Sequence, residues 1–545
     1  MPFALILDDV SLAHVPGTVI LDDAKSTSQV VHQLKHGTGR NRHVVLVPQP
    51  SEDVNDPLNW STGKKLAAYL VTLFGTCLYA GCTSPLLNAG LLVIAGEFKV
   101  GIMDVALLAG EQMLVVGVTS PFVLALARKY GKRPIYLFSS IMAVIGTVVC
   151  QTANEFPTLR AGRVVQGFSV TAYESIVFAS VGDLFFVHER GLYLAATNFM
   201  FAGISSLVSV ISGPIVDNLG WRYQFHIFLA AVVLQTILQF FFVPETTYRR
   251  DVRYNIGTVV EENLEELAVV QAHNMEDKGS IEHTEAVPAT KKRTFRQGLA
   301  LYRGKYSDEN LLQLWIATFA VNLNLAVFLI AILQAFFASL LVAVAISIAQ
   351  LFGLPPYSLT TAQIGYMYLG PFIGAIIGLV FFGLVQDPLA KYLSRKNNGV
   401  YEPEYRLLLS VLSLSTSAGL FAFGYLTGSM GTTYACSAVY GIVIFGVIGC
   451  LATTSSYIMD AFHDMSAEIF IVGNCFKNFV FYGMSHSINT WLAQKGPQKV
   501  FFTLGGIALG MMVIVPIMYV FGKKYRSFWA RHNLLNKWHI RTHEY

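Results

Sequence analysis

The residues best suited to chemistry lie in one apolar stretch, 157–181, which carries Arg160, Arg163 and Glu174. Arg163 and Glu174 are 11 residues apart, which on a helix corresponds to about 20° of rotation after three turns and roughly 16 Å of rise. Their side chains therefore face one side of the helix, together with Gln166. They are too far apart for a direct salt bridge, but they can line one water-filled cavity.

Glu174 is the candidate for taking up and releasing a proton. Ionisable residues inside a membrane are costly and are therefore functional candidates by default. A carboxyl group in a low-dielectric cavity can change its protonation state during a working cycle, because burial disfavours its charged form. The same carboxylate could instead bind a cationic substrate, or only hold a hydroxyl or amide of a neighbouring helix. Glu111 is the second candidate acid, although its place near a helix end also fits a capping role.

A polar stripe runs along another apolar stretch, 467–493. Its members are spaced 4, 4, 3 and 4 residues apart and fall within an arc of about 80° on a helix; they are Asn474, Asn478, Tyr482, Ser485 and Asn489. Lys477 borders this stripe and could be the counter-charge of an acid. Such a face can line a path for a substrate or hydrogen-bond neighbouring helices. The candidates for a substrate cavity are Tyr79, Gln166, Asn322, Asn324, Asn474, Lys477, Asn478 and Tyr482.

Composition indicates that membrane helices hold these residues. Of 545 residues, 54% are hydrophobic and only 13% are charged, and the mean hydropathy is +0.51. A soluble domain carries about 25% charged residues, so the chain lacks the polar surface of a water-soluble protein. The net charge of +4 is too small to indicate nucleic-acid binding. The six cysteines lie in apolar runs without the spacing of zinc ligands, and we expect no metal and no cofactor.

Windows of about 20 apolar residues, the length that crosses a bilayer, predict twelve spans. They cover 66–90, 103–127, 134–152, 157–181, 192–216, 221–243, 313–352, 361–386, 406–426, 432–457, 467–493 and 498–521. The seventh window is too long for one straight helix, which indicates an interfacial approach segment or a bend. Gly353-Leu354-Pro355-Pro356 is expected to end it.

The spans predict an all-α membrane protein with two six-helix bundles. The expected segments are a cytoplasmic tail 1–65, a bundle 66–243, a cytoplasmic central loop 244–310, a bundle 311–521 and a cytoplasmic tail 522–545. Orientation follows from Lys and Arg in the short loops, above all the four basic residues within 128–133. We expect a monomer in the cell membrane, with a vacuolar or other internal membrane as the alternative. Asn59, in the sequon Asn59-Trp60-Ser61, would lie on the unglycosylated side.

Two kinds of membrane protein are disfavoured by missing motifs. The sequence contains no GxxxxGK[ST], so it has no recognisable P-loop for ATP hydrolysis. It also contains no HExxH, the zinc-binding motif of many metalloproteases, so a membrane zinc protease is disfavoured. An energy-coupled transporter without ATP must use an ion gradient, and two six-helix halves suit alternating access.

Short motifs in a fixed order extend through most of the chain. They are His14-Val15-Pro16-Gly17-Thr18, Asp56-Pro57-Leu58-Asn59-Trp60-Ser61, Tyr130-Gly131-Lys132-Arg133-Pro134, Arg163-Val164-Val165-Gln166-Gly167, Gly182-Asp183, His188-Glu189-Arg190-Gly191, Gly213-Pro214, Gly220-Trp221-Arg222, Pro244-Glu245-Thr246, Pro355-Pro356-Tyr357, Asn398-Gly399, Glu402-Pro403-Glu404 and Arg406-Leu407. In these motifs the chain resembles the major facilitator superfamily, and within it the fungal branch of drug:proton antiporters.

The resemblance implies several roles. Arg163 would be the helix-4 arginine linked to proton coupling, and helices 1, 4, 7 and 11 would supply the substrate cavity.

The motif between helices 2 and 3 departs from the family pattern, because Leu124 replaces a Gly and Arg128 replaces the Asp that helps to latch the two halves. The latch must therefore be modified. Candidate residues for this cytoplasmic gate are Gly131, Arg133, Asp183, Glu189 and Arg190.

The antiporter motif on helix 5 is only partly present, with Ser209 and Asp217 at positions where Gly is usual. Our hypothesis is a secondary transporter, not an enzyme, that exports a drug, toxin or metabolite in exchange for protons. The first alternative is proton-driven uptake of an organic cation such as a polyamine. A non-transporting nutrient sensor on the same fold is the second, and its tails contain no evident signalling module. A membrane enzyme is disfavoured because no catalytic cluster is visible.

Overall fold

The computed structural model describes residues 6–7, 15–20, 50–51, 53–248, 293–306, 310–397, 400–462 and 465–537. Its N-terminal half contains α1 (Thr62–Gly75), η5 (Thr76–Cys82), η6 (Pro85–Leu87), α2 (Leu91–Phe98), α3 (Ile102–Tyr130), α4 (Lys132–Gln151), α5 (Phe156–Ser175), α6 (Val177–Leu184), α7 (Val187–Leu219) and α8 (Trp221–Phe242). Its C-terminal half contains α11 (Leu311–Ala320), η8 (Val321–Leu323), α12 (Leu325–Gly353), α13 (Thr361–Tyr366), α14 (Leu369–Lys396), η9 (Pro403–Leu414), α15 (Ser415–Gly428), α16 (Thr433–Ala461), α17 (Ser466–Lys495), α18 (Pro497–Met511) and α19 (Ile514–Arg531). The short elements outside the two halves are β1 (Val19–Ile20), η4 (Pro57–Asn59), α10 (Phe295–Gly298), β2 (Val400–Tyr401) and α20 (Leu534–Lys537).

The predicted all-α membrane fold is confirmed. Within the described ranges, eleven helical segments are long and apolar enough to cross a membrane. The twelfth long helix, α17, has 30 residues but is less apolar, because it carries the polar stripe and Lys477. It nevertheless packs along α3 and α12 inside the bundle. A buried polar face on a membrane helix is satisfied by neighbouring helices rather than by lipid.

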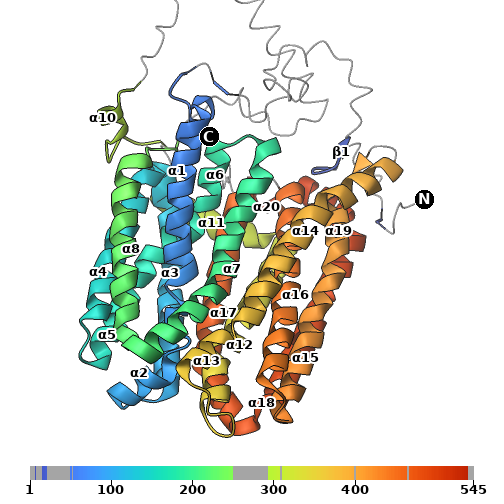
Figure 1. Cartoon of the computed structure of the whole chain (residues 1–545). Coiled ribbons are helices and arrows are strands. Elements are labelled where there is room, and N and C mark those ends of the chain that lie inside the picture. Colours follow the sequence, from blue (N-terminus) through green and yellow to red (C-terminus); the bar gives the residue numbers. More distant parts are fainter. Residues whose placement is uncertain are drawn as a thin grey trace, which may run out of the picture.

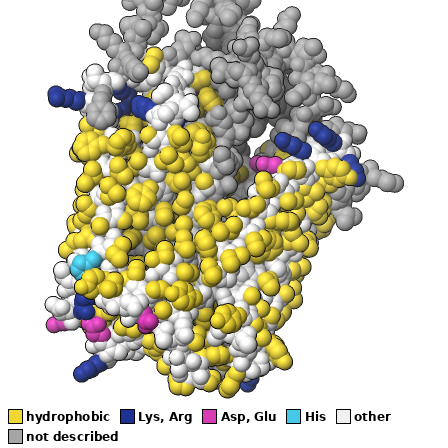
Figure 2. Space-filling view, viewed as in Figure 1, with side chains coloured by type: hydrophobic (Ala, Val, Ile, Leu, Met, Phe, Trp, Pro, Cys, Tyr) yellow, Lys and Arg dark blue, Asp and Glu magenta, His cyan; other side chains and the backbone are white. Residues whose placement is uncertain are grey.

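The two halves stand side by side, with the blue-to-green half on the left and the yellow-to-red half on the right (Figure 1). We call the end with β1, α10 and α20 the termini end, and the end with α2, α13 and α18 the opposite end. The middle of the visible surface is hydrophobic, and charged side chains gather towards its two ends (Figure 2). This distribution suits a chain whose central belt faces lipid.

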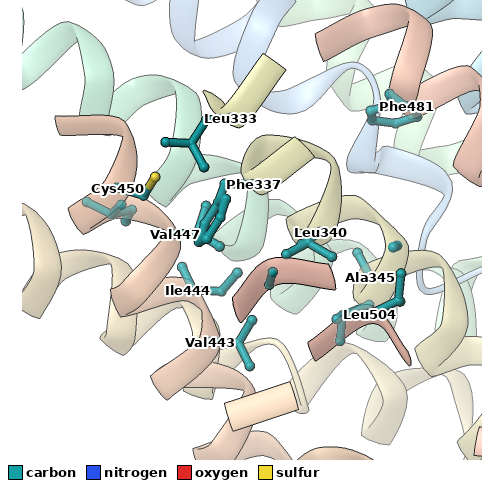
Figure 3. Close-up of a cluster of buried hydrophobic side chains, with 14 of the residues drawn as sticks. Leu333, Phe337, Leu340, Ala345, Val443, Ile444, Val447, Cys450, Phe481 and Leu504 are labelled. Atoms are coloured by element: carbon teal, nitrogen blue, oxygen red, sulfur yellow. The ribbon is translucent and has the colours of Figure 1, made fainter. Parts of the chain in front are cut away.

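Each half has its own buried cluster of apolar side chains. The larger cluster lies mainly in the C-terminal half, where Phe337 of α12 meets Ile444 and Val447 of α16 (Figure 3). Lipid is as apolar as these side chains, so close packing, more than exclusion from water, holds such helices together. Near the opposite end, Gly213 of α7 packs closely against Gly365 of α13 in the other half. A Cβ atom on Gly213 would lie 2.9 Å from the Cα atom of Gly365.

Several of the membrane helices are interrupted, and three of these breaks lie next to candidate residues. The first changes from α1 to the π-helical η5 and ends at Cys82, before the short turn η6. The fourth breaks between α5 and α6 at Ile176. The seventh window breaks at Asn324 into the short segment of α11 and η8 and the 29-residue α12, which is long enough to cross a membrane by itself, so the window is not one straight helix. As predicted, α12 ends at Gly353.

Asn324 stabilises the bend in the seventh helix as an N-cap. Its fully buried side chain accepts hydrogen bonds from the backbone N–H groups of Ala326 (3.1 Å) and Val327 (3.4 Å). Replacing Asn324 with Ala is expected to cost about 1 kcal/mol, the usual value of a lost cap, and to lower the Tm in detergent by about 2 °C. Asn322→Ala is the control, because the Asn322 side chain only donates to Phe319 O in its own turn. Equal losses in the two variants would contradict the capping role.

Two features of the termini end differ from the predicted segments. The last helix continues to Arg531, ten residues beyond the expected end of the twelfth span at 521. The extra turns are basic, and they are held by acidic residues of the C-terminal half. In addition, β1 of the N-terminal tail pairs with β2, which precedes η9. The sequence analysis treated the tail only as a polar segment.

Candidate functional site

Glu174 lies at the break in the fourth membrane helix. It is the penultimate residue of α5, and the next residue but one, Ile176, has φ −108° and ψ −3° before α6 begins. The adjacent Tyr173 is fully buried and packs against Tyr79 and Tyr136, with ring centroids 4.6 and 4.9 Å apart. This aromatic cluster fixes the end of α5 inside the N-terminal half, and it leaves Glu174 directed towards the other half. Interrupted helices are a recurring way to build binding sites within a membrane.

The carboxylate of Glu174 forms an ion pair with Lys477 of α17, across the boundary between the halves. Only 4% of the Glu174 side chain and 24% of the Lys477 side chain are exposed. Asn474, one turn earlier on α17, donates a hydrogen bond to the backbone oxygen of Glu174 at 3.2 Å. The pair joins residues that are about 300 positions apart. Lys477 is therefore the counter-charge of an acid, as the sequence analysis suggested.

The polar stripe of α17 faces the N-terminal half along its length. Near the middle, Asn478 packs against Gly117 of α3. Further towards the opposite end, Ser485 and Tyr482 pack against Gly110 of α3. These contacts follow the spacing of the stripe, so the predicted face is real and is directed between the halves. We call this contact of α17 with α3 and α5 the α17 seam.

Several buried polar atoms in the α17 seam have no hydrogen-bond partner among the described residues. They include both side-chain polar atoms of Asn478 and Asn489, and one carboxylate oxygen of Glu174, Oε2. Leaving such groups unpaired costs free energy, so native proteins pair them or supply water or a ligand. The seam therefore offers hydrogen-bonding capacity to a proton, water or polar substrate. Gln112 of α3 also has two unpaired side-chain polar atoms and is fully buried, but it carries no charge, so nothing in the sequence distinguished it within its apolar window.

Arg163 and Gln166 support the first helix rather than the surface around Glu174. The guanidinium of Arg163 donates to the backbone oxygens of Thr83 (2.8 Å) and Ser84 (3.3 Å), beyond the end of η5. It also donates to Gln166 Oε1 at 2.9 Å. Both side chains are fully buried in the N-terminal half, as is Tyr79 of η5. Arg163 thus pairs with the free carbonyl groups of an irregular stretch of backbone. Arginine suits this role because its guanidinium has five N–H donors in a rigid fork.

Glu111 forms a two-pronged ion pair with Arg160 nearer the opposite end. The Nε–H of Arg160 donates to Glu111 Oε2 at 2.7 Å, and its other prong contacts Oε1. More than half of the Arg160 side chain is exposed, whereas Glu111 is 11% exposed. Arg160 therefore reaches towards the membrane surface, as a snorkelling arginine does. Glu111 and Glu174 belong to two separate charge pairs.

At the termini end, an ion pair between Arg128 of α3 and Glu468 of α17 joins the two halves at 2.6 Å. Both side chains are buried, with 8% and 1% exposed. Arg128 is the residue that replaces the expected Asp, so in this chain a cation occupies this position and pairs with an acid of the other half. Two residues further along α17, the ring of Phe470 stacks on Phe178 of α6 with centroids 5.6 Å apart. Glu468 lies in the first turn of α17, at its polar start, where nothing in the sequence distinguishes it as a functional residue.

The other gate candidates come together inside the N-terminal half. Gly131 turns the chain between α3 and α4 with φ +97°. Lys132 Nζ pairs with Asp183 Oδ2 at 2.6 Å, and the buried Arg133 donates to Phe240 O at 2.7 Å and to Val243 O. The carboxylate of Glu245 accepts the backbone N–H groups of Lys132 and Arg133. The side chains of Glu189 and Arg190 lie outside the described residues.

The site joins one acid and one cation across the two halves. No group of three or more His, Cys, Asp or Glu in the described ranges could hold a metal ion. The hydrogen bonds of two other candidates are local, because Asn324 caps α12 and Asn322 bonds within its own turn. At the seam, one proton on Glu174 would remove one of two opposite charges that join the halves. Breaking a buried ion pair changes the interaction energy by several kcal/mol.

Comparison with known proteins places these features in a family. The model for "Major Facilitator Superfamily" matches residues 71–480. Protein HOL1 of Saccharomyces cerevisiae is 23% identical, over 97% of each chain. The MFS-type transporter hepF of Aspergillus oryzae is 25% identical, over 91% of this chain and 96% of its own. An uncharacterised MFS-type transporter of Schizosaccharomyces pombe is 24% identical, over 96% and 94%.

Solved structures agree on the fold. The proton:xylose symporter XylE bound to 6-bromo-6-deoxy-D-glucose has a TM-score of 0.57 and 11% identity, covering 86% of this chain and 100% of its own. A partially occluded inward-open conformation of XylE from E. coli has a TM-score of 0.54 and 11% identity, covering 84% and 98%. At this identity the likeness concerns the arrangement of helices alone.

Proposed function

Because the chain belongs to the major facilitator superfamily, we propose that it is a proton-coupled secondary transporter that exports a small organic compound by alternating access. The observation that supports this proposal best is the buried ion pair between Glu174 and Lys477, at a helix break and across the two halves. Its relatives in Aspergillus oryzae and Schizosaccharomyces pombe carry the name MFS-type transporter. We place the protein in the cell membrane as a monomer, with both termini in the cytoplasm.

In the proposed cycle, Glu174 takes up the proton. Oε1 of the carboxylate faces Lys477, whereas Oε2 has no hydrogen-bond partner among the described residues and is the oxygen open to a proton. Protonation leaves a neutral acid beside the ammonium, and the attraction across the α17 seam weakens. The two halves can then rock apart on that side and expose the polar stripe. Loss of the proton to the other compartment restores the pair and resets the halves.

The ion pair also supports a second candidate function, proton-driven uptake of an organic cation. Lys477 places an alkylammonium group against Glu174, and a substrate amine of the same chemistry could take its place. Asn474 and Asn478 lie on the same face of α17 and offer amide groups to further polar atoms of such a substrate. The two candidates share Glu174 and differ in the direction of net transport.

A transport screen tests the proposal. The protein would be expressed in a yeast strain lacking related pumps, and growth would be measured against a panel of toxic organic compounds. We expect resistance to rise several-fold for at least one compound, with faster efflux of that compound from preloaded cells, and to vanish when the proton gradient is collapsed. Net accumulation of radiolabelled spermidine would favour the second candidate. Transport that persists without a proton gradient would contradict both.

A further inference from the structure

A segment of the N-terminal tail docks on the C-terminal half, although the chain enters the N-terminal half next. Residues Val19 and Ile20 of β1 pair antiparallel with Tyr401 and Val400 of β2, in the register Val19↔Tyr401 and Ile20↔Val400. This strand pair lies at the termini end, beside α14 and α19 (Figure 1). The tail therefore fastens to the half that is most distant from it in sequence.

The docking surface is built around one buried arginine. Arg526 of α19 is 2% exposed, and its Nη2 atom contacts Glu402 Oε2 at 2.9 Å and Glu404 Oε2 at 2.8 Å. Lys523, one turn earlier, pairs with Glu402 Oε1 at 2.7 Å. Two carboxylates and two cations balance in charge. We call these four residues the Arg526 cluster. Buried ions need every remaining donor and acceptor to be paired.

The tail supplies the polar atoms that complete the cluster. The Thr18 hydroxyl donates to Glu402 Oε2 at 2.8 Å, and the backbone oxygen of Pro16 accepts from Arg526 Nη1. One uncharged turn thus gives a donor to the acid and an acceptor to the base. Hydrogen bonds to charged groups are the stronger ones, about 1.5–3 kcal/mol each.

Gly17 makes the turn between these two contacts possible. Its φ of +86° is a conformation that residues with a side chain rarely adopt. A Cβ atom there would also lie 2.9 Å from Asp460 O and 3.1 Å from Arg526 Nη1, which leaves no room for a methyl group. Neighbouring contacts extend the surface, because Val15 is buried and the Leu7 N–H donates to Val520 O of α19 at 3.1 Å.

We propose that the termini end of the C-terminal half is a docking site for the Pro16-Gly17-Thr18 turn, and that this turn is a specific ligand of the Arg526 cluster held in the same chain. Shape and chemistry agree at each position: an acceptor at 16, no side chain at 17 and a hydroxyl donor at 18. Docking ties together three segments of the C-terminal half, since it joins β2, the end of α16 at Asp460 and α19. The site does not depend on which compound is transported.

Cleavage of the intact protein between the tail and the first helix tests the docking. A protease site placed within residues 25–45 of the full chain would let the N-terminal fragment leave after cutting, unless its contacts hold it. We expect the fragment to stay with the washed, detergent-solubilised protein. Thr18→Val should weaken retention about tenfold, because one hydrogen bond to a charged group is lost, and Thr18→Glu should abolish it by repulsion from Glu402. Thr18→Ser should retain it.

Gly17→Ala should release the fragment, whereas Gly63→Ala, at the open start of α1 where a Cβ meets nothing within 4 Å, should not.

A disulfide provides an independent readout in the uncut protein. Cysteines at Ile20 and Val400 should cross-link, and cysteines at Ile20 and the exposed Val54 of the N-terminal half should not. Release of the unsubstituted fragment at the rate of Thr18→Glu, or equal cross-linking of both pairs, would overturn the proposal. Loss of transport alone would leave these readouts unchanged.

Discussion

The Glu174→Gln variant is expected to lose proton-driven transport by roughly 100-fold, the scale on which a positioned acid or base contributes to a proton-transfer step. Gln has nearly the same shape as Glu but cannot take up a proton at neutral pH. Transport would be measured in vesicles with an imposed pH gradient, using the compound that the growth screen identifies. The residual rate should no longer depend on that gradient.

The same substitution also leaves Lys477 without its counter-charge, and this effect must be separated from transport. An unpaired charge in such a site costs about 3 kcal/mol, so the single variant should be less stable. Adding Lys477→Met removes the second charge, and the double variant should recover its Tm and abundance without recovering transport. Glu97→Gln is the matched control, because Glu97 forms a half-exposed ion pair with Arg222 outside the α17 seam. Normal coupled transport in the double variant would exclude Glu174 as the proton carrier.

The second large effect concerns the ion pair between Arg128 and Glu468. Arg128→Glu places two carboxylates together in a buried contact between the halves, which should favour the state in which the termini end is open. A cost of about 3 kcal/mol corresponds to roughly a 100-fold change in that equilibrium. A cysteine introduced at Asn478, which is fully buried in the seam, should then react much faster with a membrane-impermeant maleimide added on the side of the termini end.

Exchanging the two charges provides the control for this effect. The variant that carries both Arg128→Glu and Glu468→Arg should bring the labelling rate back towards that of the parent protein, because the attraction is restored with opposite polarity. Arg296→Glu changes an exposed arginine of α10 at the same end and should have little effect. If the exchanged pair labels as fast as Arg128→Glu alone, the contact does not act as a latch.

The sequence predicted the class of fold because a bilayer imposes the same requirement on every span. Each crossing needs about 20 apolar residues, and the excess length of the seventh window correctly indicated that it is not one straight helix. The polar stripe on α17 was also predictable, since a helix repeats every 3.6 residues and side chains at spacings of 3 and 4 share a face. Its direction towards α3 was set by the packing of the helices.

Other features depended on how helices pack, which no local pattern encodes. Arg163 and Glu174 do share a helix, but Arg163 donates hydrogen bonds to the irregular backbone after η5. The carbonyl groups there have lost their helical partners. Asn324 looked like a cavity residue and proved to be a cap, since the break in the seventh helix leaves N–H groups to satisfy. A polar residue in an apolar window has several physical roles, and only its surroundings distinguish them.

The sequence by itself determined that this chain crosses a membrane many times, and which helix face is polar, because hydropathy and helical period are properties of neighbouring residues. Only the tertiary structure decided which charges meet. Lys477 reaches Glu174, Glu468 reaches Arg128, and Thr18 reaches Glu402. In each case the partners are separated by hundreds of residues, and they meet only because the two halves close against each other and the tail returns to the far half. Charge attraction does not depend on sequence distance, so these pairings are set by the folded geometry.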